Sequence, residues 1–141
     1  MSLEADILNK YRNVAVVGAS SSPERPSHIV VSYLMKHGYH VMPVNPGEQK
    51  ILGKTSYPNL SSIPEKVEVV DIFRRPEDVM PIVDEAIKIG AKVVWMQEGV
   101  INEEAAARAR NAGLLVVMDR CMRKEHLLLA RSKRRKKIGS E

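Results

Sequence analysis

Short apolar runs alternate with amphipathic stretches along the chain. The runs cover residues 14–18, 40–44, 67–73, 92–96 and 114–118. The first, Val-Ala-Val-Val-Gly, is apolar throughout, as in a parallel strand that is covered on both faces. Regular strand–helix alternation is typical of an α/β fold whose parallel strands are joined by right-handed crossovers. We predict a single Rossmann-like, doubly wound domain: a five-stranded parallel sheet in the order 3-2-1-4-5 with helices on both faces.

Helical spacing of apolar residues and recognisable end signals predict the helices between these strands. Leu3, Ile7 and Leu8 indicate a short N-terminal helix. Pro81 can make the first turn of one later helix irregular. The other expected helices are one over 28–37 capped by Ser27, one over 76–89 opened by Pro76, one through Ala112 capped by Asn102, and a last one over 122–134.

Positive charge is concentrated at the C-terminal end of the chain. The net charge is +5, from 22 Lys and Arg against 17 Asp and Glu. Six of those basic residues and one acidic residue lie in residues 131–141, so residues 1–130 are neutral. We therefore divide the chain into a Rossmann-like domain over 1–130 and a basic tail over 131–141. We interpret the tail as a solvated, frayed terminus. Nucleic-acid binding through the tail is a weaker alternative, because the tail lacks aromatic residues that stack on bases.

The loop after the first run is made of small residues, Gly18-Ala-Ser-Ser-Ser22, followed by Arg25-Pro-Ser27. Such a loop lets backbone N–H groups at a helix N-terminus approach a phosphate. A nicotinamide-binding Rossmann unit would carry an acidic residue at the end of the second strand. This chain has Asn45-Pro46 there, which argues against a nicotinamide cofactor. The loop therefore predicts a nucleotide site, and a nicotinamide-dependent oxidoreductase is the alternative.

Arginines and polar residues follow the other predicted strands. Ligands of such sheets bind outside the carboxyl ends of the strands. Phe73-Arg-Arg-Pro76 follows the third strand, Gln97-Glu-Gly99 the fourth and Asp119-Arg-Cys121 the fifth. Together with Arg25, these segments bring four guanidinium groups to one rim, which favours a ligand rich in phosphate.

Other chemistries find less support in the sequence. The four histidines form no recognisable metal-ligand motif, and a single cysteine, Cys121, excludes an internal disulfide. No Ser-His-Asp arrangement or nucleophile elbow is evident. We therefore expect neither a metal nor catalysis.

Residues 14–122 resemble the stand-alone CoA-binding domain proteins. These are similar to the N-terminal CoA-binding domain of the succinyl-CoA synthetase alpha subunit and of ADP-forming acyl-CoA synthetases. The matching segments lie in the expected order along the chain: Val17-Gly-Ala-Ser20 with Arg25-Pro-Ser-His28, Pro43-Val-Asn-Pro46 with Gly53 and Tyr57-Pro58, Val70-Asp-Ile-Phe-Arg-Arg-Pro76, Trp95-Met-Gln-Glu-Gly99, and Asp119-Arg-Cys-Met122.

The resemblance implies coenzyme A, or an acyl-CoA, as the ligand. By this resemblance Ser20, Ser21 and Ser22 hold the pyrophosphate beside Arg25, and Asn45 and Pro46 flank the adenosine. Phe73, Arg74 and Pro76 line the adenine and 3′-phosphate side, and the pantetheine arm faces Gln97, Glu98 and Gly99. The full candidate set is Gly18, Ala19, Ser20, Ser21, Ser22, Arg25, Pro26, Ser27, Asn45, Pro46, Lys50, Phe73, Arg74, Arg75, Pro76, Gln97, Glu98, Gly99 and Cys121.

Two departures from the family pattern qualify this picture. The synthetases have a lysine shortly after the proline of the second strand, whereas here Lys50 or Lys54 must substitute. The synthetase alpha subunit also has a further domain with a phosphorylated histidine, and this chain ends before one. We therefore expect no synthetase activity from the chain by itself, with docking on a separate synthetase subunit as an alternative role.

Cys121 lies between Arg120 and Arg123 at a predicted helix N-terminus, a setting that favours the thiolate. An inert buried thiol is one interpretation, and a mixed disulfide with CoA under oxidation is the other. The N-terminus lacks the basic and apolar regions of a signal peptide, and no apolar run is long enough to span a bilayer. We expect a cytoplasmic protein with no membrane contact, and a homodimer is the default assembly.

Overall fold

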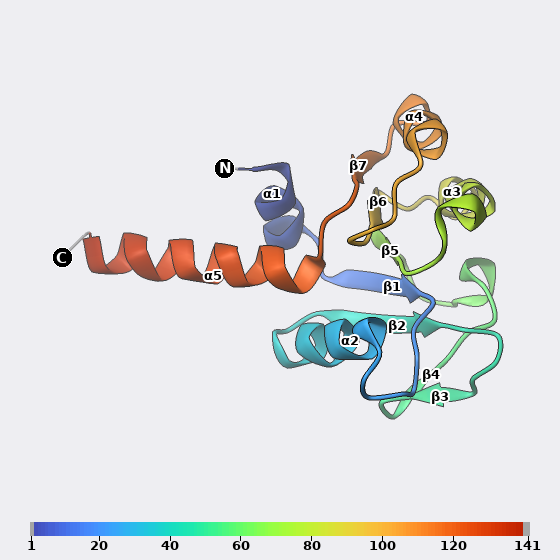
Figure 1. Ribbon diagram of the computed structural model, residues 1–141, viewed down its shortest axis with the longest axis horizontal. Coiled ribbons are helices and arrows are strands. Elements are labelled where there is room, and N and C mark those ends of the chain that lie inside the picture. The colour runs from blue at the N-terminus through green and yellow to red at the C-terminus, as the bar shows by residue number, and fades with distance from the viewer. Residues whose placement is uncertain (1, 140–141) are drawn as a thin grey trace.

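A three-layer α/β arrangement places one parallel sheet between two groups of helices (Figure 1). The computed structural model describes the backbone of residues 2–139 and the side chains of residues 2–136. The sheet strands are β1 (Asn13–Val17), β2 (His40–Val44), β5 (Val69–Ile72), β6 (Val93–Met96) and β7 (Leu115–Val117). The helices are α1 (Leu3–Lys10), α2 (Pro26–Lys36), α3 (Val79–Lys88), α4 (Glu103–Asn111) and α5 (Met122–Gly139).

The sheet is five-stranded and parallel, as predicted, but its order is β2-β1-β5-β6-β7. Counting only these five strands, the order is 2-1-3-4-5, so the predicted order 3-2-1-4-5 is wrong. The third sheet strand, β5, pairs with β1 through Val14–Val69 to Val17–Ile72 instead of lying outside β2. Because right-handed crossovers permit either placement, the alternation of elements could not decide between them. The outer edge of β2 is instead bridged by Tyr57 at Val44.

Each strand is buried on both faces, which explains why the runs are apolar without alternation. On one face, α3 and α4 pack through small and branched residues such as Val83, Ala86 and Ala109. On the other face, α1, α2 and α5 pack over a second cluster that includes Leu34 and Trp95. The prediction of helices on both faces is confirmed.

The helix ends differ from the sequence prediction in three places. Arg25, not Ser27, occupies the N-cap of α2, because Pro26 already stands at the first helical position. The 3₁₀ turn η2 (Pro76–Asp78) precedes α3, so the regular helix begins at Val79. The last helix, α5, runs past the predicted end at residue 134 to Gly139. The described part of the basic tail is therefore helical rather than frayed, and α5 crosses the predicted 130/131 boundary without a break.

The segment between β2 and β5 is rich in glycine and proline, yet it contains short regular elements. It contains a small antiparallel hairpin, β3 (Lys50–Ile51) with β4 (Lys54–Thr55), and the 3₁₀ turn η1 (Leu60–Ser62). Ile51 and Leu60 are buried and anchor the segment to the body. Within residues 2–139, no helix combines the length and the apolar character needed to cross a membrane.

Candidate functional site

The carboxyl ends of β1 and β5 lie side by side, while the helices that follow them leave toward opposite faces of the sheet. The chain passes from β1 to α2, which packs on the Leu34 face, and from β5 to α3, which packs on the Val83 face. This divergence opens a crevice at the point where the strand order reverses, which is the usual ligand position in such sheets. The corrected strand order therefore places the site between β1 and β5.

A cavity of about 670 Å³ occupies this point, and we call it the crevice. Its lining comes from four segments that the sequence sets far apart: the loop after β1, the start of α2, the segment after β5, and the segment after β6. The residues are Gly18, Ser20, Arg25, Pro26, Ser27, Phe73, Arg74, Arg75, Pro76, Asp78, Gln97, Glu98, Gly99 and Val100. Twelve of these fourteen belong to the candidate set predicted from the sequence, and Asp78 and Val100 are additions.

Gly18 fixes how closely the two strand ends approach. Its φ is +90°, and a Cβ atom there would lie 2.1 Å from the carbonyl oxygen of Phe73. On the two sides of this contact, the Gly18 N–H donates to Val44 O at 3.0 Å, and the Phe73 N–H donates to Val17 O at 2.8 Å. Only glycine accommodates both the backbone conformation and the contact.

The start of α2 supplies a partly unsatisfied helix terminus on one side of the crevice. Arg25 at the N-cap position makes no capping hydrogen bond with its side chain, and Pro26 has no N–H. The first N–H groups of a helix have no partner within the helix and carry its positive dipole end. With the exposed guanidinium of Arg25 beside them, they form a suitable contact for a phosphate.

Hydrogen bonds hold the serine loop after β1 in a defined shape. His28 Nδ1–H donates to Ser20 O at 2.8 Å, and the Ser22 N–H donates to Ser20 Oγ at 3.0 Å. Ser21 Oγ–H donates to Glu48 Oε1 at 2.7 Å, outside the crevice lining. His28 thus orders the loop from α2, whereas Ser21 and Ser22 belong to its outer side.

Asn45 contacts the loop after β1 from outside the crevice lining. Its Nδ2–H donates to Ala19 O at 2.8 Å, and its Oδ1 accepts from the Gly47 N–H, also at 2.8 Å. Ala19 is fully buried. Asn45, Pro46, Ala19 and Lys50 therefore do not line the crevice, and Asn45 ties the loop after β1 to the loop after β2.

Arg74 and Arg75 lie on the opposite wall, at the end of β5. Arg75 Nε is 3.0 Å from Asp78 Oδ2 and 3.3 Å from Glu77 Oε1. The hydrogen bond that Arg75 Nε–H donates to Asp78, together with the negative charges of Asp78 and Glu77, raises the pKa of Arg75. Arg74 has no acidic partner among residues 2–136, so its guanidinium is available to an anionic ligand.

The floor of the crevice holds a buried hydrogen-bond acceptor with no partner. Gln97 is 6% exposed, and its Oε1 has no hydrogen-bond partner among the described residues. Leaving a buried acceptor unsatisfied costs about 1–3 kcal/mol. Because Gln97 lines the crevice, a bound N–H or O–H donor is a natural way to remove that cost.

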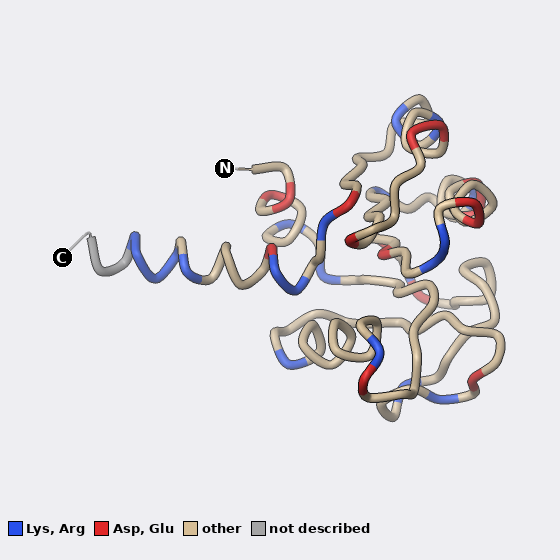
Figure 2. The backbone as a smooth tube through the Cα atoms, viewed as in Figure 1, with Lys and Arg blue, Asp and Glu red and all other residues tan. Residues whose placement is uncertain are grey.

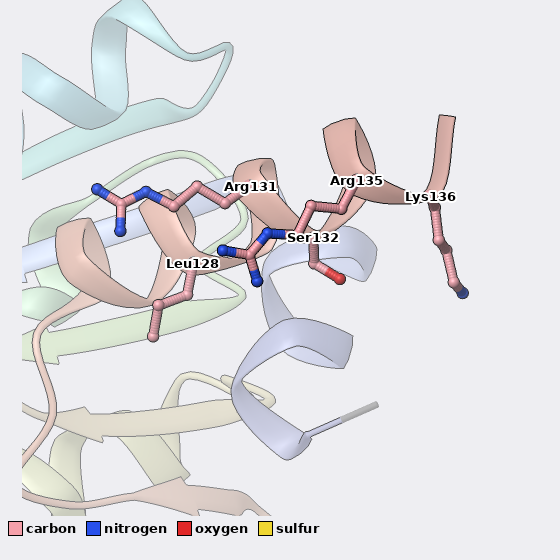
Figure 3. Close-up of a pocket in the computed structure, with 5 residues that line it drawn as sticks. All are labelled: Leu128, Arg131, Ser132, Arg135 and Lys136. Carbon is pink, nitrogen blue, oxygen red and sulfur yellow. The ribbon is translucent and has the colours of Figure 1, made fainter. Parts of the chain in front are cut away.

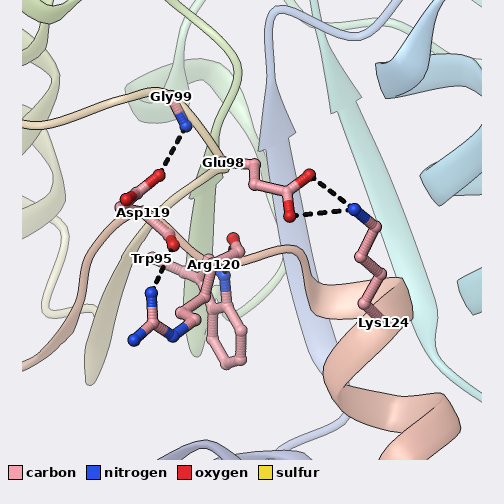
Figure 4. A network of polar contacts seen from close by, with 6 residues as sticks. All are labelled: Trp95, Glu98, Gly99, Asp119, Arg120 and Lys124. Atoms are coloured by element: carbon pink, nitrogen blue, oxygen red, sulfur yellow. Dashed lines mark hydrogen bonds and ion pairs between the residues drawn. The ribbon is translucent and has the colours of Figure 1, made fainter.

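The segment after β6 is tied to the start of α5 (Figure 4). Lys124 Nζ donates to both carboxylate oxygens of Glu98 at 2.9 Å, and the Gly99 N–H donates to Asp119 Oδ1 at 2.7 Å. The hydrogen bond to Glu98 raises the pKa of Lys124. These contacts fix the Gln97–Val100 segment in place, and no sequence signal indicated that Lys124 would reach it.

Cys121 does not line the crevice. It is 7% exposed and packs in the cluster with Trp95 and Met122. Its sulfur lies close enough to Lys124 to influence the pKa of that side chain, so it is adjacent to the Glu98 contact. Arg120 also points elsewhere, since its guanidinium donates to Asp119 O at 2.8 Å. Of the four arginines expected on one rim, three line the crevice.

Asp71 lies in β5, two residues before Phe73, and its carboxylate has no hydrogen-bond partner among the described residues. It is fully buried in β5 between Val16 and Trp95, and neither carboxylate oxygen is hydrogen-bonded. Burial raises the pKa of Asp71 well above its ordinary value. A carboxylate inside an apolar run was a visible sequence signal. Among the described residues, no group of three or more His, Cys, Asp and Glu side chains could hold a metal ion.

Known proteins are similar to this chain in sequence and in fold. YneT of Bacillus subtilis is 36% identical over 121 residues, which are 86% of this chain and 90% of YneT. The alpha subunit of ADP-forming acetate–CoA ligase I of Pyrococcus furiosus is 34% identical over 100 residues, or 67% of this chain but only 21% of the subunit. The chain thus corresponds to a small part of the ligase and to nearly all of YneT.

Among solved structures, a hypothetical protein from Pyrococcus horikoshii superposes with a TM-score of 0.88 at 49% identity, over 90% of this chain and 89% of that one. The family model described as a CoA binding domain matches residues 12–127. That range contains every strand of the large sheet and every residue that lines the crevice. The chain belongs to the CoA-binding domain family.

Proposed function

We propose that this protein binds coenzyme A, or an acyl-CoA, in the crevice between the ends of β1 and β5. Membership of the CoA-binding domain family supports the ligand class. The crevice itself carries the proposal, because it joins a partly unsatisfied helix start, the Arg25 and Arg74 guanidinium groups and the buried acceptor of Gln97. CoA offers matching groups, namely phosphates for the cations and amide N–H donors for Gln97.

We infer the orientation of CoA from the family resemblance and from the residues that line the crevice. We place the diphosphate on the loop after β1 and the start of α2, and the adenosine with its 3′-phosphate beside Phe73 and Arg74. The pantetheine arm then runs along Gln97 and Gly99 toward Val100, which is 7% exposed. Lys50 does not line the crevice, whereas Arg74 does, so Arg74 is the better candidate for the contact with the 3′-phosphate.

The proposed role is binding without catalysis, as a carrier or a regulator. Ser20 and Ser27 supply the hydroxyl groups in the lining. Neither hydroxyl is hydrogen-bonded to a histidine ring among residues 2–136, since His28 contacts the backbone carbonyl of Ser20. Glu98, a possible general base, is held by Lys124. This arrangement lacks the activated nucleophile that acyl transfer needs. Docking of the CoA-loaded protein on a separate synthetase subunit is the alternative role, and a cytoplasmic location remains our prediction.

Cys121 could couple binding to redox state. The proposed step is thiol–disulfide exchange: the Cys121 thiolate attacks CoA disulfide, a protein–CoA disulfide forms, and one CoA thiolate leaves. The position of Cys121 beside Lys124, whose partner Glu98 lines the crevice, supports this step. Its small exposed fraction implies that exchange is slow and needs local opening of the start of α5.

Calorimetric titration of the nucleotide-stripped protein tests the ligand class. The panel contains CoA, dephospho-CoA, NAD and NADP. We expect CoA to bind most tightly, and dephospho-CoA to bind less tightly because it lacks the phosphate that Arg74 would contact. Binding of a nicotinamide cofactor without binding of CoA would overturn the proposal and favour the oxidoreductase alternative.

A further inference from the structure

The C-terminal half of α5 forms a second cationic region, remote from the crevice. We define the basic end of α5 as residues 131–136, all of which are exposed. It contains five cations, Arg131, Lys133, Arg134, Arg135 and Lys136. The helix projects beyond the sheet and the other helices, and α1 is the element that lies along it (Figure 1). Figure 2 shows several blue segments along this end of the helix and no red segment on it.

Acidic side chains among residues 2–136 do not neutralise these charges. Lys133 Nζ donates to Asn9 Oδ1 on α1 at 2.7 Å, which is a contact with a neutral amide. None of the five cations forms an ion pair with an acidic side chain among residues 2–136. Like charges three and four positions apart, as at Arg131 and Arg135, weaken a helix. An anionic partner would therefore relieve repulsion as well as gain attraction.

The cations surround the helix instead of forming one stripe. Successive residues turn about 100° around a helix axis. One side forms a shallow groove of about 400 Å³ lined by Leu128, Arg131, Ser132, Arg135 and Lys136 (Figure 3). Lys133 and Arg134 fall outside that groove, on other sides of the same two turns. The side that carries Lys133 faces α1, so a matching partner must present negative charge to the remaining sides of the helix.

The charge distribution selects among anionic partners. A flat membrane or an acidic protein face would contact one side of the helix and leave the other cations unpaired. Single-stranded nucleic acid is bound by stacking on aromatic residues, and residues 128–136 contain none. The major groove of B-form DNA is about 12 Å wide and has phosphates on both walls, so it encloses a helix of about 10–12 Å diameter.

We propose that the basic end of α5 binds double-stranded DNA by lying in its major groove and contacting phosphates on both strands, without reading sequence. Residues 131–136 have no amide group that pairs with adenine, and we assign their Arg and Lys side chains to phosphates, whose contacts carry no sequence information. This function is independent of CoA binding, since the crevice and the basic end share no residue.

Fluorescence anisotropy of the full chain with a labelled 20-bp duplex of mixed sequence tests the proposal. At low salt we expect micromolar binding, with log K falling against log[salt] at a slope of about −3 to −4.5, because each neutralised phosphate contributes about −0.9. A second duplex of unrelated sequence should bind equally well. The test variant is Arg134→Glu/Arg135→Glu. The matched control, Lys66→Glu/Lys92→Glu, changes net charge equally at exposed positions of the body.

The test pair should lower affinity at least tenfold and the control pair less than threefold, with both retaining the far-ultraviolet circular dichroism of the parent protein. Single strands, duplex RNA, polyglutamate and anionic vesicles serve as competitors. Duplex RNA should compete weakly, because side chains cannot enter its deep, narrow major groove. The proposal is overturned if no duplex binds at 50 mM salt, if both pairs lose affinity equally, or if any of these competitors displaces the duplex as well as unlabelled duplex DNA does.

Discussion

The crevice and the basic end of α5 both gather positive charge, but they hold it in opposite ways. In the crevice, backbone contacts at Gly18, the Asn45 bridge and the Glu98–Lys124 contact fix the walls before any ligand arrives. At the basic end of α5, five exposed cations stand on a projecting helix with no ion-pair partner among residues 2–136. The difference indicates a shape-selective site for a small ligand in the first region and a contact for an extended polyanion in the second.

The largest expected effect lies at Gly18, where the crevice depends on backbone packing. In Gly18→Ala, the new Cβ would clash with the Phe73 carbonyl and the positive φ would add strain, so we expect a loss of about 3 kcal/mol in unfolding free energy. Urea denaturation measures this. Gly113→Ala is the control, because its φ of +89° carries the strain but its Cβ meets nothing within 4 Å. That variant should lose about 1–2 kcal/mol, and equal losses would show that the Phe73 contact is unimportant.

Asp71 should make stability depend on pH. Burial raises its native pKa above the value of 3.8 expected when unfolded. Between these two values the native state holds one proton more, so stability falls as pH rises, by about 1.4 kcal/mol per pH unit. Asp71→Asn should remove this slope and be more stable at neutral pH, while converging with the parent protein below pH 3.8.

Urea denaturation between pH 3 and pH 8 measures the Asp71 effect. Glu24→Gln, which removes an exposed carboxylate, should keep the slope. If the unfolding free energies of the parent protein and Asp71→Asn depended on pH in the same way, the Asp71 carboxylate would have a hydrogen-bond partner in solution.

A substitution at Gln97 tests the proposed contact between the crevice and the pantetheine arm of CoA. Gln97→Met keeps the size of the side chain but removes the buried acceptor, so CoA affinity should fall about tenfold, the value of one hydrogen bond. Adenosine 3′,5′-bisphosphate, which lacks the pantetheine arm, should bind both proteins alike. Calorimetry measures the affinity for both ligands. An equal loss of affinity for the two would mean that Gln97 contacts the nucleotide and not the pantetheine arm.

The smallest expected effect is partial modification of Cys121. Incubation with CoA disulfide should add the mass of one CoA slowly, because the thiol is 7% exposed. Intact-mass spectrometry without reductant detects the adduct, and Cys121→Ser should abolish it. Persistence of the adduct in that variant would exclude Cys121, the single cysteine of the chain, and with it the disulfide.

The sequence predicted the elements of the fold well because burial on both sheet faces leaves a continuous apolar run at each strand. It could not predict that β5 lies beside β1, because contacts between distant residues decide this. Glu68 Oε1, for example, accepts the Arg12 and Asn13 N–H groups at 3.1 Å. The length of α5 was also underestimated. Arg and Lys are good helix formers, and this preference outweighs their mutual repulsion over residues 131–139.

Most predicted site residues after β1, β5 and β6 line the crevice, whereas those after β2 do not. Gly18 and Gln97 come immediately after a strand, Arg74 is the second residue after β5, and all three line the crevice. Lys124 reaches Glu98 from a helix 26 positions away in the sequence, which no local pattern reveals. Asn45 was assigned to the ligand, yet its amide is occupied by the backbone of Ala19 and Gly47. Position at a strand end thus identifies the rim, but side-chain hydrogen bonds decide which residues are free to line the crevice.

The most direct test of the central claim is amide chemical-shift mapping of the ¹⁵N-labelled protein during titration with CoA. Binding in the crevice predicts the largest shifts at residues 18–27, 73–76 and 97–100. Residues 131–136 should stay unchanged until duplex DNA is added. Shifts confined to the β3–β4 hairpin or to α5, or no shifts at saturating CoA, would contradict the account.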